Sequence, residues 1–528
     1  MNISLISFVA FTLLVAFYSW YKLRKTKFET ASGYFLGGRS LGASLIAISM
    51  LLTNISTEHL VGMNGSAYKN GFIVMAWEVT SALALVAGAL YFIPRYLKMG
   101  LTTIPQYLEL RFDKTTHTIV NLLLLVSFVV TLLPVVLYTG ALNMETLFDV
   151  SERMNISRDT SIWLLILAIG VLGSVYAIFG GLKAIAYSDA IYGVGLFLGG
   201  LIIPIVALWN IGDSNIATGL SRVYAAAPEK FNAIGSKDSV LPFGTLFTGL
   251  VINQLYFWCM NQVIVQRALG ARNLAEAQKG FLLMGVFKIL MPIIIVLPGV
   301  IGYFYFRDLF YDSQDTIYPN LVKKVLPVSL VGFFAAVVMG TVLSTLNAVL
   351  NSAATLFSLG VYQRQINPQA GERKLVRIGK WTTVIMAVSS ILAAPLVGKA
   401  PQGLYQLLQE LNGIFFIPIA SILIGGFFIK SISAMGAKVA VFTGLLFYIL
   451  TSFVFKDLVN IHFVHVWGIE FVLNIIVMLV VSYFFKNKNH YTPTYTGEVD
   501  ITPWRYAKPV GLFLVIVTIL VYILLSRN

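Results

Sequence analysis

Long apolar runs recur along the whole chain, and this recurrence constrains the fold more than any other feature. The hydrocarbon core of a bilayer is about 30 Å thick, so a helix needs about 20 apolar residues to cross it. In lipid the backbone must satisfy its own hydrogen bonds, and helices of this length do so. The sequence therefore predicts an all-α membrane protein with about fourteen transmembrane helices. The predicted spans lie near 3–21, 45–67, 72–97, 117–147, 160–180, 185–210, 244–266, 279–306, 328–357, 378–397, 404–429, 434–455, 464–485 and 508–525.

Composition supports one membrane domain and no nucleic-acid partner. Hydrophobic residues make up 58% of the 528 and charged residues only 11%, against roughly 25% charged in soluble domains. The net charge of +14 comes from Lys and Arg in short runs between apolar spans, a pattern that reports membrane topology. Cys259 is the only cysteine, which excludes an intramolecular disulfide and a cysteine-ligated zinc site.

Basic residues also predict the orientation of the chain in the membrane. Loops that follow the odd-numbered spans carry the excess of Lys and Arg, so we expect them inside the cell and both termini outside. The basic run at 22–27 follows the first apolar run rather than preceding it, which is the reverse of a signal peptide and indicates a retained first helix. We expect a multi-pass protein of the plasma membrane, in bacterial terms the inner membrane.

Two spans contain polar stretches that lipid-facing helices avoid. The second carries TNISTEH at 53–59, and the seventh carries NQLYFW at 253–258 followed by Asn261 and Gln262. Broken helices five spans apart are typical of transporters built from two inverted five-helix repeats. Outside the spans, the mixed segments near 211–243 and 307–327 are predicted to form short surface helices or lids.

Ionisable residues inside a membrane cost at least about 2.5 kcal/mol each, so they usually face a cavity or pair with one another. We predict that those here line a polar pocket, with internal ion pairs that fix helix packing as the alternative. Asp189 is either an interfacial residue or an ion relay. The residues concerned are Glu58, His59, Glu78, Asp189 and Lys288.

Amide, aromatic and hydroxyl side chains extend this prediction. Gln254, Gln409, Phe257 and Tyr405 offer hydrogen bonds and ring stacking to a sugar, although aromatic residues in membrane helices more often serve packing. Near 341–347 adjacent hydroxyls lie in an apolar helix. They either supply oxygens to Na⁺ together with an unwound segment, or bond back to carbonyls of their own helix.

The sequence resembles the sodium/solute symporter family, in particular its sodium/glucose cotransporter branch, over nearly the whole chain. The motifs that carry the resemblance are GYFLGGRSL at 33–41, NISTEH at 54–59, GGLKA at 180–184 leading to Asp189, YFWC at 256–259, NQVIVQR at 261–267, Pro298-Gly299, Ser344-Thr345, Leu350-Asn351-Ser352, and Gln409 before Asn412-Gly413.

The resemblance implies a leucine-transporter-like core and a division of the chain. It implies an extra helix and loop (1–44), a first repeat (45–210), an external loop (211–243), a second repeat (244–429) and three C-terminal helices (430–528). Phe257 stands where the branch has a tyrosine that caps the sugar. The implied sugar site comprises His59, Glu78, Ser81, Gln254, Lys288 and Gln409, with Glu58 beside it. The implied Na⁺ site comprises the carbonyls of Leu52, Ile55 and Thr341 and the hydroxyls of Ser344 and Thr345.

We therefore expect a sodium-coupled symporter, not an enzyme, that carries a neutral sugar or polyol. A carboxylate, amino acid or vitamin as cargo, and H⁺ as the coupling ion through Asp189, are the nearest alternatives. A channel or a solute sensor is more remote, because the internal loops are too short for a signalling domain. The sequence leaves the exact solute, the number of ions and the oligomeric state open.

Overall fold

The structure is a computed structural model, and it describes residues 3–23, 30–307, 309–310, 313–399, 403–486 and 495–526. The described chain is helical throughout. Eleven of its helices are long and apolar enough to cross a membrane, and two shorter apolar helices cover Ile3–Ser19 and Ala43–Asn54. The all-helical membrane fold is confirmed. The count of about fourteen spans stays a prediction, because the structure joins or interrupts several of the predicted runs.

The first half of the chain, up to residue 211, alternates long helices with short ones. Its elements are α1 (Ile3–Leu23), α2 (Ala31–Leu36), η1 (Gly37–Arg39), α3 (Ala43–Asn54), η2 (Glu58–Met63), α4 (Asn64–Asn70), η3 (Gly71–Met75), α5 (Ala76–Val79), α6 (Ser81–Ala87), η4 (Gly88–Phe92), α7 (Ile93–Lys98), α8 (Ile104–Arg111), α9 (Lys114–Ser127), η5 (Phe128–Leu132), α10 (Leu133–Phe148), α11 (Val150–Met154) and α12 (Arg158–Ile211).

The second half begins with surface elements and continues with seven longer helices. Its elements are α13 (Ile216–Ala226), η6 (Pro228–Phe231), η7 (Phe243–Phe247), α14 (Gly249–Cys259), α15 (Gln262–Leu269), α16 (Leu274–Phe306), η8 (Gln314–Thr316), α17 (Ile317–Val325), α18 (Val328–Thr355), η9 (Leu356–Ile366), α19 (Glu372–Ala393), η10 (Ala394–Lys399), α20 (Leu404–Phe428), α21 (Ala434–Ile449), η11 (Leu450–Val454), α22 (Phe463–Phe484) and α23 (Ala507–Leu525).

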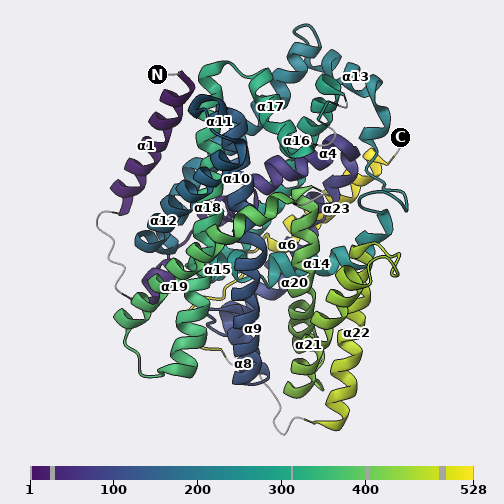
Figure 1. Cartoon of the computed structure of the whole chain (residues 1–528). Coiled ribbons are helices and arrows are strands. Elements are labelled where there is room, and N and C mark those ends of the chain that lie inside the picture. Colours follow the sequence, from purple (N-terminus) through teal and green to yellow (C-terminus); the bar gives the residue numbers. More distant parts are fainter. Residues whose placement is uncertain are drawn as a thin grey trace.

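The helices form one bundle in which segments distant in sequence are neighbours. α3 packs against α12, α16 and α18, while α20 packs against α14, α21 and α22. Both ends of the chain lie toward the end of the bundle that carries α11, α13 and α17 (Figure 1). The surface helices α13 and α17 occupy the two segments that the sequence predicts to form short helices or lids.

Two helices are interrupted where the sequence predicts it. α3 ends at Asn54, Ile55 has extended backbone angles, and the chain resumes as the π-helix η2. α14 ends at Cys259, and the side chain of Asn261 accepts a hydrogen bond from Val263 N to cap the start of α15. Helix ends leave backbone groups free inside the membrane, and such groups are tolerated only where they line a cavity or meet protein.

The structure departs from the prediction near Gly180. The sequence motif there indicates a turn between two spans, but the backbone stays helical through this point, within α12. Glycine is tolerated inside membrane helices, and no proline stands at this point to remove a hydrogen bond. The apolar windows Arg158–Ile178 and Ile185–Ile211 still give two separate candidate spans.

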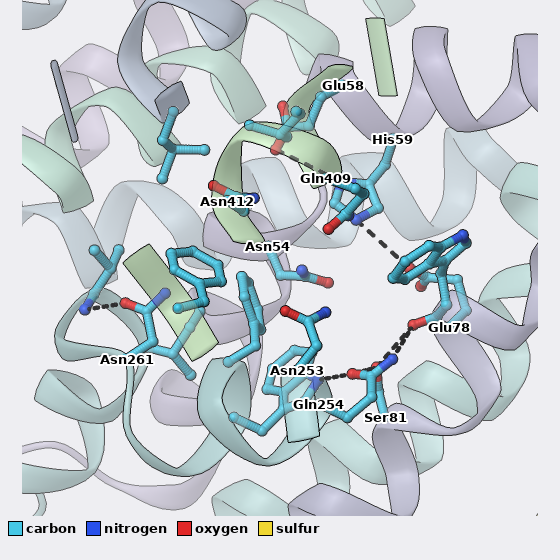
Figure 2. Close-up of a pocket in the computed structure, with 18 of the residues that line it drawn as sticks. Asn54, Glu58, His59, Glu78, Ser81, Asn253, Gln254, Asn261, Gln409 and Asn412 are labelled. Atoms are coloured by element: carbon cyan, nitrogen blue, oxygen red, sulfur yellow. Dashed lines mark hydrogen bonds and ion pairs between the residues drawn. The ribbon is translucent and has the colours of Figure 1, made fainter. Parts of the chain in front are cut away.

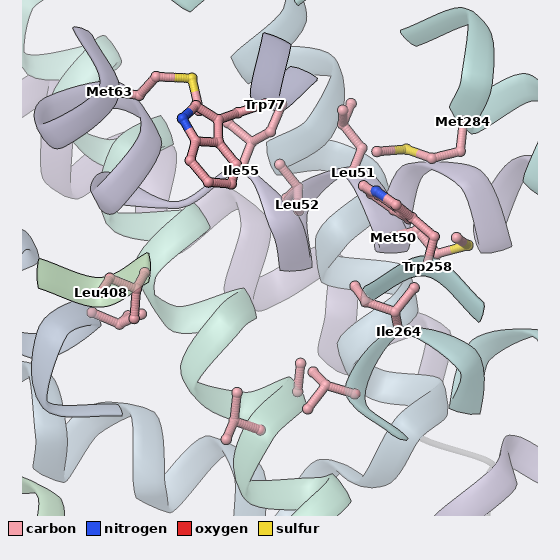
Figure 3. Packing of buried hydrophobic residues seen from close by; sticks show 14 of the residues in the cluster. Met50, Leu51, Leu52, Ile55, Met63, Trp77, Trp258, Ile264, Met284 and Leu408 are labelled. Atoms are coloured by element: carbon pink, nitrogen blue, oxygen red, sulfur yellow. The ribbon is translucent and has the colours of Figure 1, made fainter. Parts of the chain in front are cut away.

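A hydrophobic core surrounds the interrupted segments. Leu52 and Ile55 at the end of α3, Trp258 at the end of α14 and Met284 of α16 are all buried (Figure 3). Leu408 brings α20 into the same core. The ends of the broken helices are therefore held between rigid helices, which fixes the positions of the polar groups beside them.

Candidate functional site

A small polar cavity lies where the two broken helices meet α16 and α20. Its volume is about 60 Å³, and its lining includes Glu58, His59, Glu78, Gln254 and Lys288. Sites that hold drug-sized ligands are usually about 300–1,000 Å³. Entry of a solute therefore requires the surrounding side chains to separate. Every substrate residue predicted from the sequence borders this cavity: Glu58, His59, Glu78, Ser81, Gln254, Phe257, Lys288, Tyr405 and Gln409.

Four ionisable side chains form a chain across one wall of the cavity. Lys288 Nζ lies 2.6 Å from Glu78 Oε2, and both side chains are 1% exposed. His59 Nε2 lies 3.6 Å from Glu78 Oε1 and His59 Nδ1 lies 3.6 Å from Glu58 Oε1, as Figure 2 shows. The four side chains therefore line the cavity and also pair with one another.

Gln254 has its hydrogen-bonding capacity taken up by the protein. Its Oε1 accepts from Ser81 Oγ at 2.9 Å and from Trp258 Nε1 at 3.2 Å. Its Nε2 donates to the Trp77 carbonyl at 2.9 Å and to Thr80 Oγ1 at 3.1 Å. A solute that bonds to Gln254 or Ser81 must displace these contacts, and without a solute the two residues join α14 to α6.

Three asparagines offer free acceptors that the sequence analysis did not assign. The Oδ1 atoms of Asn54, Asn253 and Asn412 are buried and have no hydrogen-bond partner among the described residues, and all three side chains line the cavity (Figure 2). Amide oxygens accept hydrogen bonds from hydroxyl groups. A usable sequence signal existed, because Asn54 and Asn253 stand at the predicted breaks and Asn412 lies three residues after Gln409 on the same helix.

Aromatic rings close the cavity on several sides. Tyr405 packs edge-on to His59 and Trp77, with ring centroids 5.4 Å and 5.9 Å apart. Phe257 packs edge-on to Trp258 at 5.1 Å. Lys288 Nζ lies 5.2 Å from the centre of the Trp258 ring. These rings supply flat apolar surfaces beside the amides, which is the combination that binds a sugar ring.

The predicted Na⁺ residues lie where α18 passes the end of α3. Thr345 Oγ1 lies 3.2 Å from the Leu52 carbonyl oxygen and 3.1 Å from that of Thr53. Ile55, Thr341 and Ser344 are buried at the same junction. Oxygen atoms from two helices, one of them unwound, are the ligands that suit Na⁺ in transporters of this kind.

Asp189 lies in a buried network that joins three helices. Its Oδ2 accepts from Ser49 Oγ at 2.5 Å, and Arg267 Nε donates to the same hydroxyl at 3.1 Å. Arg267 also donates to Thr53 Oγ1 at 2.5 Å. The structure therefore buries Asp189 beside α3 and near Ser344 of the predicted Na⁺ residues, and its role as an interfacial residue or an ion relay stays a prediction.

Broken helices beside a polar cavity, inside a bundle of membrane-length helices, are typical of secondary transporters. The family model described as Sodium:solute symporter family matches residues 34–444. The chain belongs to the sodium:solute symporter family, and Na⁺ is its coupling ion.

Several relatives extend over most of the chain. An uncharacterized symporter, YidK, of Escherichia coli (strain K12) is 45% identical over 521 residues, which cover 99% of this chain and 90% of that protein. The sodium/glucose cotransporter of Vibrio parahaemolyticus is 31% identical and covers 80% of each chain. The human sodium/myo-inositol cotransporter is 31% identical over 80% of this chain and 63% of its own.

A solved structure shows the same fold. The outward-open, substrate-bound structure of a Na⁺-coupled sialic acid symporter superimposes with a TM-score of 0.78 over 93% of this chain and 99% of that one. Sequence identity between the two is 19%. The likeness supports the fold of a Na⁺-coupled symporter and carries no information on the solute of this chain.

Proposed function

We propose that the protein is a plasma-membrane symporter that couples the entry of Na⁺ to uptake of a neutral sugar or polyol. The observation that carries the proposal is the set of free amide oxygens beside a paired Glu78 and Lys288. Asn54, Asn253 and Asn412 can accept hydrogen bonds from solute hydroxyls. A polyhydroxylated solute satisfies several such acceptors at once, and aromatic rings cover its apolar faces.

The charges of the cavity favour a neutral solute over a carboxylate. Glu58 and Glu78 face one lysine, and the lining contains no arginine among the described residues. A carboxylate is best bound by the two-pronged guanidinium of arginine, and the glutamates would repel it. Relatives named for glucose and myo-inositol support the same choice.

We infer that coupling runs through the unwound segment that the two sites share. Na⁺ at Leu52, Ile55, Thr341, Ser344 and Thr345 would tie the end of α3 to α18. The same segment continues directly into Glu58 and His59 of the cavity. An ion that orders this segment therefore also orders the solute site, and its release would loosen both.

The decisive experiment is uptake of a labelled panel into proteoliposomes that carry the purified protein. The panel contains neutral hexoses, myo-inositol and an anionic sugar, each measured under inward Na⁺, K⁺ and H⁺ gradients. We expect one neutral solute to accumulate with Na⁺ only. The double variant Ser344→Ala, Thr345→Ala should reduce that uptake at least about tenfold, which corresponds to about 1.4 kcal/mol of lost Na⁺ binding.

A matched control separates loss of the ion from loss of the fold. Thr443→Ala removes a hydroxyl that bonds back to the Val439 carbonyl of its own helix at 2.8 Å, and it should leave uptake unchanged. Uptake of the anionic sugar alone would overturn the neutral-solute assignment. Full uptake by the double variant would overturn the proposed Na⁺ residues.

A further inference from the structure

A buried carboxyl group outside the transport site has no cationic partner among the described residues. Glu470 lies in the middle of α22 and is 0% exposed. Among the described residues its carboxyl group meets the side-chain amide of Asn474 and no lysine, arginine or histidine. An isolated ionised carboxylate in an apolar interior costs so much that the group takes up a proton or binds a cation instead.

The neighbouring asparagine decides which of the two occurs. Asn474 lies one helical turn after Glu470, and its Nδ2 donates to Ser421 Oγ at 3.2 Å. The Ser421 hydroxyl donates in turn to the Ile417 carbonyl at 2.8 Å, so it can only accept from Asn474. This fixes the orientation of the amide, and Asn474 Oδ1 is then a buried acceptor that has no donor among the described residues.

Glu470 and Asn474 meet over a glycine of the next helix. A Cβ atom on Gly444 of α21 would lie 2.9 Å from Glu470 Oε1 and 2.7 Å from Asn474 Oδ1. Asn474 Nδ2 lies 2.6 Å from the same point, so both ends of the amide and one carboxyl oxygen face one small space. A carboxylate could only accept from Nδ2 and would leave Oδ1 without a donor, whereas a carboxylic acid would also donate its proton to Asn474 Oδ1.

A metal cation fits this space less well than a proton. Ions such as Na⁺ require several oxygen ligands, and the Ser421 hydroxyl is already committed to Ile417 and Asn474. We propose that Glu470 is a proton-binding site, in which a neutral carboxylic acid donates to Asn474 and must keep its proton for α20, α21 and α22 to pack.

The other titratable groups on the packed helices do not supply a counter-charge. Tyr448 of α21 is the one that interacts electrostatically with Glu470, and its hydroxyl donates to the Glu410 carbonyl at 3.0 Å. The rest have partners elsewhere or are neutral. Lys438 of α21 pairs with Asp113, and Glu410 of α20 lies near Lys456. The Tyr405 ring of α20 packs on His59. On α14 the Tyr256 ring packs on Phe416, and the Cys259 thiol donates to the Ala84 carbonyl.

The site is one helical turn from a contact with the transport cavity. Trp467 of α22 packs edge-on to Trp77, which lines the cavity, with centroids 6.1 Å apart. A Cβ on Gly413 of α20 would lie 2.1 Å from Trp467 Nε1, so α20 and α22 touch here without any spare space. A charge on Glu470 would therefore separate helices that shape the solute site.

Infrared spectroscopy of the protein in lipid nanodiscs tests the protonation directly. The difference spectrum of the wild-type protein minus Glu470→Gln at neutral pH should contain the carbonyl stretch of a protonated carboxylic acid. Glu152→Gln, at an exposed position of α11, is the matched control and should remove only a carboxylate absorption. A carboxylate absorption in the Glu470 difference would overturn the proposal.

Transport and stability give an independent test. Because the native protein holds a proton that the unfolded chain releases, its melting temperature should fall as pH rises from about 6 to about 9.5. Na⁺-driven uptake of the transported solute should fall about tenfold over the same range. Glu470→Gln should show neither loss, and equal losses in the variant and the wild type would contradict the proposal.

A second variant covers the case in which Glu470→Gln does not fold. Asn474→Leu removes the acceptor but leaves the acid, so the acid carbonyl stretch of the wild-type spectrum should move to higher frequency. An unmoved band would show that the proton is not shared with Asn474. The ion and solute sites of the proposed function are untouched by both variants, so a failure here does not affect that proposal.

Discussion

At the scale of single residues, the most consequential contact is the ion pair of Glu78 and Lys288. Both side chains are buried, and their atoms are 2.6 Å apart. Taking two charges out of water costs several kcal/mol for each, and their attraction offsets this only while both are present. Removal of one partner leaves an unpaired charge in the membrane, whereas removal of both leaves an apolar cavity wall.

The pair predicts a difference between single and double substitution. Lys288→Met should lower stability by about 3–5 kcal/mol and abolish uptake, because it leaves Glu78 unpaired. The double variant Glu78→Gln, Lys288→Met should recover most of the stability without recovering uptake. Thermal unfolding in detergent and proteoliposome uptake measure the two quantities, and a double variant that stays as unstable as the single one would contradict this account.

At the scale of elements, the short helix η8 connects the segment between α16 and α17 to the helices α4 and α20. Asp315 Oδ2 accepts from Leu404 N at the first residue of α20 at 3.1 Å. A Cβ on Gly65 of α4 would lie 2.5 Å from the Gln314 carbonyl oxygen. η8 therefore contacts both α4 and α20. It lies next to α17 in the chain.

This contact predicts a pH dependence. Burial raises the pKa of the Asp315 carboxyl to about 7, although the Leu404 N–H and the charge of Lys69 oppose the shift. The protonated form is therefore favoured when η8 is docked, so docking is strongest below the ordinary pKa of about 4 and weakens as pH rises through about 7.

Hydrogen exchange around Asp315 and Leu404, corrected for the intrinsic effect of pH on exchange, measures this docking. Protection should fall between about pH 5 and about pH 8 in the wild type. Asp315→Asn, which carries no charge at any of these pH values, should make the protection independent of pH. The same pH dependence in the variant would rule out Asp315 as its source.

At the scale of the whole molecule, the Na⁺ junction connects parts of the chain that are far apart in sequence. Thr345 of α18 reaches the carbonyls of Leu52 and Thr53 at the end of α3. α18 also packs against α1, α12 and α19. An ion bound here would join the interrupted helix to the framework around it, so its effect should extend through the bundle.

Na⁺ should therefore stabilise the whole protein. A ligand at about 100 times its Kd stabilises the native state by about 2.7 kcal/mol, so the melting temperature should be higher in NaCl than in KCl at equal ionic strength. The double variant Ser344→Ala, Thr345→Ala should melt at the same temperature in both salts. A variant that keeps the full Na⁺ effect would place the ion elsewhere.

The sequence by itself determined that the chain lies in a membrane, that its fold is helical, and which polar residues are candidates for the site. Helices of membrane length follow from runs of about 20 apolar residues, and the polar stretches at 53–59 and 253–262 marked both breaks. Charged residues are rare in membrane helices, which drew attention to Glu58, His59, Glu78 and Lys288. All four border the cavity. These features are local in the chain, so one sequence suffices to read them.

Only the tertiary structure decided how those residues are used. The pairing of Glu78 with Lys288 spans 210 residues, and the commitment of Gln254 to Ser81 spans 173. Only the structure shows that the Oδ1 atoms of Asn54, Asn253 and Asn412 are free among the described residues and that the Glu470 carboxyl is buried. Whether a polar group is satisfied depends on which distant helices pack against it, and that is a property of the folded bundle.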